Sequence, residues 1–130
     1  MSTLLPPGWQ RPKGYANGVE ARGKMIFTAG VIGWDESETI VSDTLPGQFE
    51  QILKNTLAIL AEGGAGPEHI VRMTWYVTDR DDYVGHLREI GAAWRTHIGP
   101  HYPAMAVVAV TTLVEPAAKI EIETTAVVPE

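Results

Sequence analysis

The sequence contains no cysteine, and that absence removes several kinds of chemistry. A chain without thiols has no disulfide, no thiolate metal ligand and no cysteine nucleophile. It also suits a reducing compartment, so we expect a cytoplasmic protein. The histidines do not follow a metal-ligand spacing, and surface or hydrogen-bonded positions are the simpler interpretation for them. We therefore expect neither a metal nor a cofactor.

Long apolar runs and clusters of basic residues are absent as well. The longest apolar run, residues 104–110, has the length of a strand, whereas a membrane span needs roughly 18 residues. Two prolines interrupt the opening MSTLLPPGWQRPKGY, which is not the pattern of a signal peptide. The formal charge is −6 and the 10 basic residues are scattered, so a phosphate backbone is repelled. These features argue against a membrane protein and against a nucleic-acid partner.

The length of 130 residues fits a single domain that covers residues 1–130. A domain of this size buries roughly two thirds of the surface of its unfolded chain, enough to fold without a disulfide or a metal. Residues 1–14 are rich in proline and glycine, and we expect them to form an extended N-terminal arm.

Two amphipathic helices are indicated by apolar residues at helical spacing. The first lies between Pro46, which suits a first turn, and the glycine pair 63–64, which provides a left-handed stop. Its inner face carries Phe49, Ile52, Leu53, Leu57 and Leu60. The second helix follows Thr78 or Asp79 as N-cap and ends before Gly99. Its inner face carries Val84, Leu87, Ile90 and Trp94.

Strands are indicated where apolar and polar residues alternate. Residues 24–30 form one strand with 15–19 as a short partner, residues 71–77 form a half-buried strand, and residues 104–112 and 118–127 close the chain. The order β-β-α-β-α-β-β predicts an α+β fold, with one mixed sheet and two helices on one of its faces. Residues 104–112 are apolar on both faces, so the open face needs cover from other copies of the chain or from the arm. We favour a closed homo-oligomer with sites between subunits.

Glu121 and Glu123 lie two residues apart on the last strand, so their side chains point to the same face. A solvated strand face is the ordinary interpretation of such a pair. If this face meets a neighbouring subunit, a carboxylate there is removed from water and is suited to acid-base chemistry. Nucleophilic catalysis has less support, because no GxSxG motif is present and the serines lie in arms and loops. Trp34, in a polar loop, is either a packing lid or a wall of a ligand site.

Three segments in sequence order carry a family resemblance. KGYANGVEARGKMIFTAGVIG is similar to a hairpin in which a glycine-tyrosine leads into a strand and a turn. HIVRMTWYVTDRDDY is similar to a strand followed by a helix, and HYPAM with AKIEIETTAVV is similar to a closing pair of strands. Together they resemble the RidA/YjgF (reactive intermediate deaminase) family over residues 14 to 128.

This resemblance implies a homotrimer with a chorismate-mutase-like fold and a small-molecule cleft at each subunit interface. In the family's deaminases an enamine tautomerises to an imine, water attacks the imine carbon, and ammonia leaves. The first glutamate of the tail motif matches Glu121, which would act as general base. The cleft tyrosine matches Tyr15. The remaining expected substrate-binding positions are Ala29, Gly30, Val31, Ile32, Trp34, Met105 and Ala106.

One departure from the family concerns the substrate anchor. Its deaminases have Pro-Ala-Arg where this chain has Pro-Ala followed by Met105. The arginine binds the substrate carboxylate through a bidentate pair, and its loss should cost about 2–5 kcal/mol of binding. Ala29 replaces a frequent serine, which makes the expected cleft more apolar. Arg72 and Lys119 are expected to share the face of Glu121, and either could supply a replacement cation.

Two functions stay open at this point. The first is a hydrolase of imines or enamines, of the 2-iminobutanoate/2-iminopropanoate deaminase type, with a more apolar substrate. The second is a non-catalytic trimer that binds a small metabolite or has a regulatory role. Some members of the family carry endoribonuclease labels, but the charge of −6 and the absence of a basic stripe argue against RNA cleavage.

Overall fold

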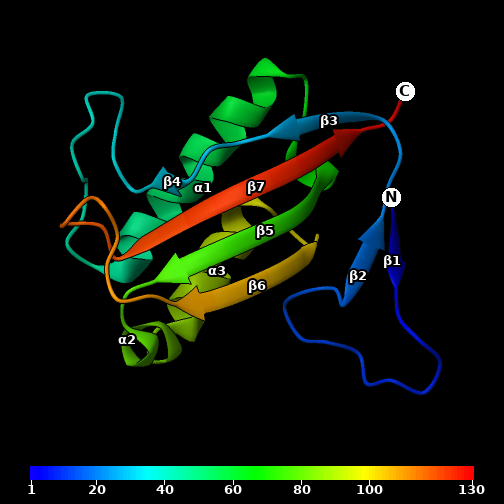
Figure 1. Ribbon diagram of the computed structural model, residues 1–130, viewed down its shortest axis with the longest axis horizontal. Helices are drawn as coiled ribbons and strands as arrows, with labels where there is room; N and C mark the ends of the chain where they lie inside the picture. The colour runs from blue at the N-terminus through cyan, green and yellow to red at the C-terminus, as the bar shows by residue number, and fades with distance from the viewer.

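The computed structural model describes residues 1–130 and contains one five-stranded sheet with helices on one face (Figure 1). The strands of this sheet are β3 (Lys24–Phe27), β4 (Val31–Ile32), β5 (Ile70–Val77), β6 (Ala104–Ala109) and β7 (Ile120–Val128). Their order is β3-β7-β5-β6, with β4 also paired to β7, and β5 and β6 run parallel.

Behind the sheet in Figure 1 lie α1 (Leu45–Glu62) and α3 (Leu87–His97). The short helices α2 (Arg80–Val84) and η1 (Pro67–His69, a 3-10 turn) complete the helical layer. The predicted α+β fold with its helices on one face of a mixed sheet is thus confirmed. No helix of the chain is both long enough and apolar enough to cross a membrane.

Helix α1 begins and ends where the sequence predicts. The Thr44 hydroxyl accepts a hydrogen bond of 3.1 Å from the Gly47 amide, and Pro46 occupies the first turn. At the other end Gly64 adopts φ 80°, in the left-handed region that favours glycine. The apolar stripe of the helix packs against the sheet and is completely buried at Phe49, Ile52, Leu53 and Leu60.

The second predicted helix is divided into α2 and α3, so the expectation of one continuous helix is wrong. Asp79 caps α2, because its carboxylate accepts a hydrogen bond of 3.0 Å from the Asp82 amide. The chain leaves the helical path at His86, with φ −123° and ψ 22°, directly after Gly85. Glycine is a weak helix former, and the His86 ring contacts the Asp82 carbonyl at 2.7 Å, where a helix amide would bind.

The N-terminal strands also pair differently from the prediction. Residues 15–19 do not pair with β3; instead β2 (Gly18–Glu20) pairs with β1 (Ser2–Leu4) in a separate two-stranded sheet. Leu4 packs over Gly18, which leaves room for its side chain. β3 pairs with β7, and a side chain at Gly23 would collide with the backbone of Val128. The arm therefore contains a short strand that depends on this pairing.

The strand register assigns the sheet residues to two faces. On the helix side, the side chains are apolar and at most 4% exposed: Met73, Trp75, Val77, Ile120 and Ile122. They belong to a single core cluster of 17 residues that also includes the inner faces of α1 and α3. Burial on this scale supplies most of the driving force for folding.

The open face of the sheet is different in character. Its centre carries polar side chains from β5 and β7, namely Thr74, Tyr76, Glu121 and Glu123. Apolar side chains flank this centre and are exposed: Phe27 at 65% and Met25 at 57% on β3, and Val108 at 42% on β6. Exposed apolar groups of this size around a polar centre are typical of a contact surface.

Gln48, on α1, connects the helical layer to the loop that precedes β7. Its side chain is fully buried, and its Nε2 donates hydrogen bonds of 2.9 Å to the carbonyls of Ser42 and Ala117. Its Oε1 accepts a hydrogen bond of 2.8 Å from the Lys119 amide. These bonds satisfy the buried amide and fix the start of β7, two residues before Glu121.

Candidate functional site

Glu121 lies on the open face of β7, between Ile32 of β4 and Tyr76 of β5 in the strand register. Its side chain is half-buried and has no hydrogen bond or ion pair within the chain. The carboxylate lies directly against Gly30, and a side chain at that glycine would overlap its Oε2 atom. The structure thus places an unpaired carboxylate beside an exposed stretch of backbone.

The second glutamate of the pair has a partner. The Tyr76 hydroxyl donates a hydrogen bond of 2.9 Å to Glu123 Oε1. This bond raises the pKa of Tyr76 above its ordinary value of 10.0, and desolvation and the charges of Glu123 and Glu121 act in the same direction. Tyr76 therefore stays neutral and keeps its hydrogen bond to the Glu123 carboxylate. Glu121 is left as the carboxylate of this face that has no hydrogen-bond partner.

The turn that the sequence predicted as a cleft wall is split in two. Ala29 and Gly30 are exposed beside Glu121, whereas Val31 and Ile32 are buried as strand β4. The turn is held in place by Thr28, whose amide and hydroxyl form bonds of 2.9 and 3.0 Å with the backbone of Thr124. Only the first half of the turn therefore presents backbone to a ligand at this face.

Trp34 is half-buried in the loop after β4 and bridges to Ile40. Its carbonyl accepts a hydrogen bond of 2.8 Å from the Asn55 side chain on α1. The tryptophan thus lies near the β4 end of the sheet and does not line the cavity that contains Met105. The structure does not bring these two predicted site residues together.

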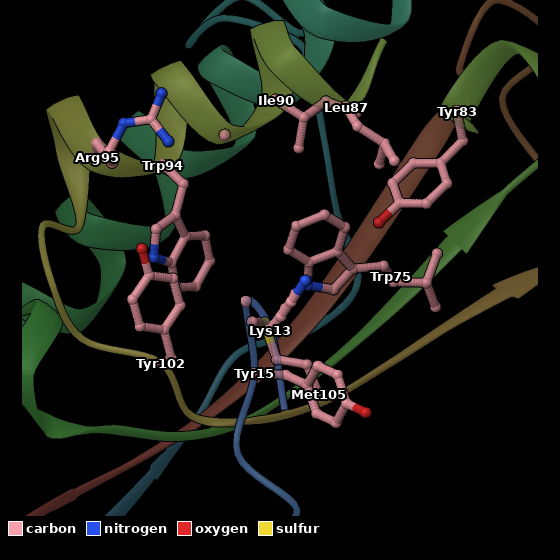
Figure 2. A pocket seen from close by; sticks show the side chains of 13 residues that line it. Lys13, Tyr15, Trp75, Tyr83, Leu87, Ile90, Trp94, Arg95, Tyr102 and Met105 are labelled. Atoms are coloured by element: carbon pink, nitrogen blue, oxygen red, sulfur yellow. The ribbon is translucent and has the colours of Figure 1, made fainter. Parts of the chain in front are cut away.

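Met105 lies on the other side of the sheet from Glu121, and Tyr15 lies beside it at the edge of β6. Met105 is in register with Met73, a helix-side residue, whereas Ala106 is in register with Thr74 on the open face. Tyr15 is brought close to β6 by the neighbouring Ala16, whose amide donates a hydrogen bond of 2.9 Å to the Pro103 carbonyl. Tyr15 and Met105 both line a cavity of about 620 Å³ between α3 and the strands β5 and β6 (Figure 2).

The predicted site residues therefore form two groups within one chain. Glu121 and Met105 are separated by two strand spacings and by three residues along the strand direction. With strands about 4.8 Å apart and a rise of about 3.3 Å per residue, their Cα atoms are roughly 14 Å apart, on opposite faces. A single copy of the chain cannot place both against one small substrate.

The cavity contains residues that the sequence analysis did not assign to a site. Tyr83, Leu87, Gly91, Arg95 and Tyr102 line it, together with the core tryptophans 75 and 94. Three of them follow one another at intervals of four residues along α3, which is the spacing of one helix face. A glycine in the middle of such a face was the signal available in the sequence.

The histidines are engaged in hydrogen bonds, as the sequence analysis favoured. His97 Nε2 lies 3.0 Å from Glu50 Oε2, and His101 Nε2 lies 2.7 Å from the Ile70 carbonyl. His69 Nδ1 accepts a hydrogen bond of 2.9 Å from the Gly66 amide. No three histidine, aspartate or glutamate side chains of the chain converge in the geometry of a metal site.

Comparisons with known proteins agree with this architecture. Residues 9–128 match the sequence model of the family described as Endoribonuclease L-PSP. The 2-iminobutanoate/2-iminopropanoate deaminase of Salmonella typhimurium is 32% identical over 116 residues, which cover 87% of this chain and 86% of that protein. Protein DfrA of Myxococcus xanthus is 32% identical over 123 residues, which cover 91% of this chain and 90% of that protein.

A solved structure is similar over nearly the whole chain. YyfB of Yersinia pestis, from the conserved Rid protein family, has a TM-score of 0.86, with 27% sequence identity and 98% of each chain covered. The similarity includes both the sheet and the helical layer, so the element order found here is shared with that protein.

Proposed function

This chain belongs to the Endoribonuclease L-PSP family, the RidA/YjgF group that includes imine deaminases, and on that premise we propose that it hydrolyses imines or enamines. The observation that carries the proposal is the carboxylate of Glu121, which lies unpaired against the Gly30 backbone on the open face. A free carboxylate at a surface that a second subunit covers is suited to activate water.

The proposed reaction needs one such carboxylate. The substrate reacts as the protonated imine: Glu121 accepts a proton from water as the water oxygen bonds to the iminium carbon, and the electron pair of the C=N bond moves to nitrogen to give a neutral amino group. The proton then passes from Glu121 to nitrogen, and the C–N bond breaks as the carbinol oxygen forms the C=O bond. The carbinol proton goes to the departing ammonia, so that iminium and water give a ketone and ammonium.

The proposal requires a homo-oligomer, and we favour a trimer. Within one chain Glu121 and Met105 lie on opposite faces of the sheet. A second copy is therefore needed, so that the β6 edge of one copy, with Tyr15 and Met105, meets the open face of the other, with Glu121. The exposed Phe27, Met25 and Val108 support such a contact, because they surround the polar centre with apolar surface. Because this contact joins two different surfaces of the chain, each copy can repeat it with the next copy until a cyclic oligomer closes.

Met105 determines which substrates fit. It has no charge and no hydrogen-bond donor, so a small imino acid loses the anchor that an arginine provides. Arg72 lies in register with Ala104 on the open face, so it is a candidate replacement cation on the face that carries Glu121. We therefore expect imines with a larger apolar body to be better substrates than 2-iminobutanoate.

One observation favours a second function. Met105 faces a largely apolar cavity on the helix side, which suits a ligand that is held mainly through its apolar body. A trimer of this kind would hold a metabolite without converting it, which is the non-catalytic alternative. Turnover separates the two functions, because both include binding and only the first includes release of ammonia.

The test measures ammonia release above the uncatalysed rate from freshly generated imines, both small and large. We expect wild type to accelerate an apolar imine and Glu121→Gln to lose about 100-fold or more of that acceleration. Glu123→Gln is the matched control on the same strand, because Tyr76 already occupies that carboxylate. Met105→Arg should gain activity on small imino acids.

Two outcomes would contradict this proposal, the first its reaction and the second its assignment of Glu121. If neither wild type nor Met105→Arg accelerates any imine, yet wild type binds one saturably, the protein is a binding protein. If Glu121→Gln retains full activity while Glu123→Gln does not, the wrong carboxylate has been assigned.

A further inference from the structure

The walls of the cavity behind β5 and β6 are a connected series of aromatic rings. Figure 2 shows Trp94 and Tyr102 on one side of the cavity and Trp75 and Tyr83 on the other. The ring centroids of Trp94 and Tyr102 lie 6.1 Å apart with an interplanar angle of 15°, and those of Trp75 and Trp94 lie 6.0 Å apart. Because the rings hold one another, the wall is formed before a ligand arrives. Such a wall favours a flat, unsaturated ligand that can stack on it.

The space in front of this wall exists because of Gly91. Leu87, Gly91 and Arg95 occupy one stripe of α3 that faces the cavity. Glycine is disfavoured inside a helix, so its presence here is not explained by local structure. A Cβ at Gly91 would meet only the flexible end of Arg95, at 3.2 Å from Nη1. A larger residue would therefore fill the cavity with little strain on the fold.

The charges around the cavity are all of one sign. Lys13 and Arg95 are the only charged residues that line it, and no carboxylate does. Neither cation forms an ion pair within the chain, although the whole protein has a formal charge of −6. Two unpaired cations beside an apolar cavity in an acidic protein favour an anionic ligand.

One polar atom in the wall has no partner. Trp75 is 4% exposed, and its Nε1 is buried without a hydrogen-bond acceptor. Lys13 and Tyr15, labelled in Figure 2, line the same cavity as this tryptophan. The atom is shielded from solvent. Buried donors are normally satisfied, and a ligand oxygen would satisfy this one.

From these observations we infer that the cavity binds an aromatic carboxylate, with the ring against the exposed part of the aromatic wall at Tyr102 and the acid group toward Lys13 and Arg95. The cavity volume of about 620 Å³ fits a ligand with one or two rings, since small-molecule sites span about 300–1,000 Å³. The inference deepens the proposed function and rests on it in one respect: if the site is catalytic, the substrate is an imine with an aromatic body.

The test uses unreactive probes, so that binding is measured apart from turnover. We choose 3-phenylpropanoate, which has a ring and an acid, propanoate, which has only the acid, and 3-phenylpropan-1-ol, which has only the ring. Calorimetry and tryptophan fluorescence of the full chain should show saturable binding of 3-phenylpropanoate, at least tenfold tighter than that of either control. Equal affinity for propanoate, or no saturable binding of 3-phenylpropanoate, overturns the inference.

Variants locate the binding. Gly91→Leu should fill the cavity and weaken 3-phenylpropanoate binding at least tenfold, whereas Ala92→Leu, on the exposed side of the same turn, should leave it unchanged. If Gly91→Leu does not fold, the surface variants Lys13→Gln and Arg95→Gln together should remove the preference for the acid over the alcohol. Unchanged binding in the variants that fold overturns the assignment to this cavity.

The same measurements separate this inference from the proposed reaction. Tight binding of 3-phenylpropanoate without ammonia release from any imine supports the inferred ligand of the cavity and contradicts the proposed hydrolase activity. Ammonia release from aliphatic imines, without binding of the aromatic probe, supports the proposed hydrolase activity and contradicts the inferred aromatic ligand of the cavity.

Discussion

The two faces of the sheet are built from the same strands but differ in the burial and polarity of their side chains. On β7, Ile122 is completely buried against α1, and Glu123, its neighbour, is exposed on the other face. The helix side is closed by the chain's own elements, whereas the open side combines carboxylates with exposed apolar side chains. The difference shows that one face stabilises the folded chain, and the other is the face for which we propose contact and chemistry.

The largest expected effect contrasts two adjacent residues of β7. Ile122→Ala should lower the free energy of unfolding by about 3 kcal/mol, because it leaves a cavity in the core. Glu123→Ala, one residue further, should change it by about 0.5 kcal/mol or less. Urea unfolding followed by circular dichroism measures both. Similar losses in the two variants would show that the faces do not differ as described.

A second experiment addresses the open face directly. Phe27→Lys places a charge in the exposed apolar surface, and we expect the mass in solution to fall from that of the proposed trimer to that of one chain. Ile59→Lys is the matched control, because that side chain is 43% exposed on the outer side of α1. Light scattering at several concentrations gives the mass. A wild type that is already monomeric would contradict the proposed contact.

The smallest effect concerns the electrostatics of the open face. Because the Glu123 hydrogen bond raises the pKa of Tyr76 above 10.0 in the folded protein, its stabilising contribution is complete below that pH. The contribution is lost as the pH rises through the raised value. In an absorbance titration of tyrosinate, Tyr76→Phe should remove one late-titrating tyrosine, and Glu123→Gln should make that tyrosine titrate earlier. Unchanged curves in both variants would contradict this account.

Periodicity explains which parts of the fold could be predicted. Helix α1 and strand β5 follow a strong 3.6- or 2-residue pattern, and both appear within one residue of the expected bounds. The division at Gly85 could not be read from the pattern, because the apolar residues continue in phase across it. The N-terminal pairing depends on Leu4 meeting Gly18, a contact between segments that carry no periodic pattern.

The face occupied by Met105 could not be predicted for a related reason. Residues 104–110 are apolar at every position, so alternation gives no phase that distinguishes the two faces of β6. The register with β5 provides that phase, and it places Met105 opposite Met73 on the helix side. Glu121, by contrast, lies in a strand with clear alternation, and its position on the open face agrees with the prediction.

Gly30 and Glu121 should behave as a coupled pair in any substitution experiment. Gly30 is not in the left-handed region, so the backbone alone would accept alanine there, and the restriction comes from the carboxylate of Glu121. A shorter acid, Glu121→Asp, vacates that space and should make Gly30→Ala tolerable. A side chain at Gly30 therefore requires the Glu121 carboxylate to shift, and the effects of changes at the two positions on activity will not be additive.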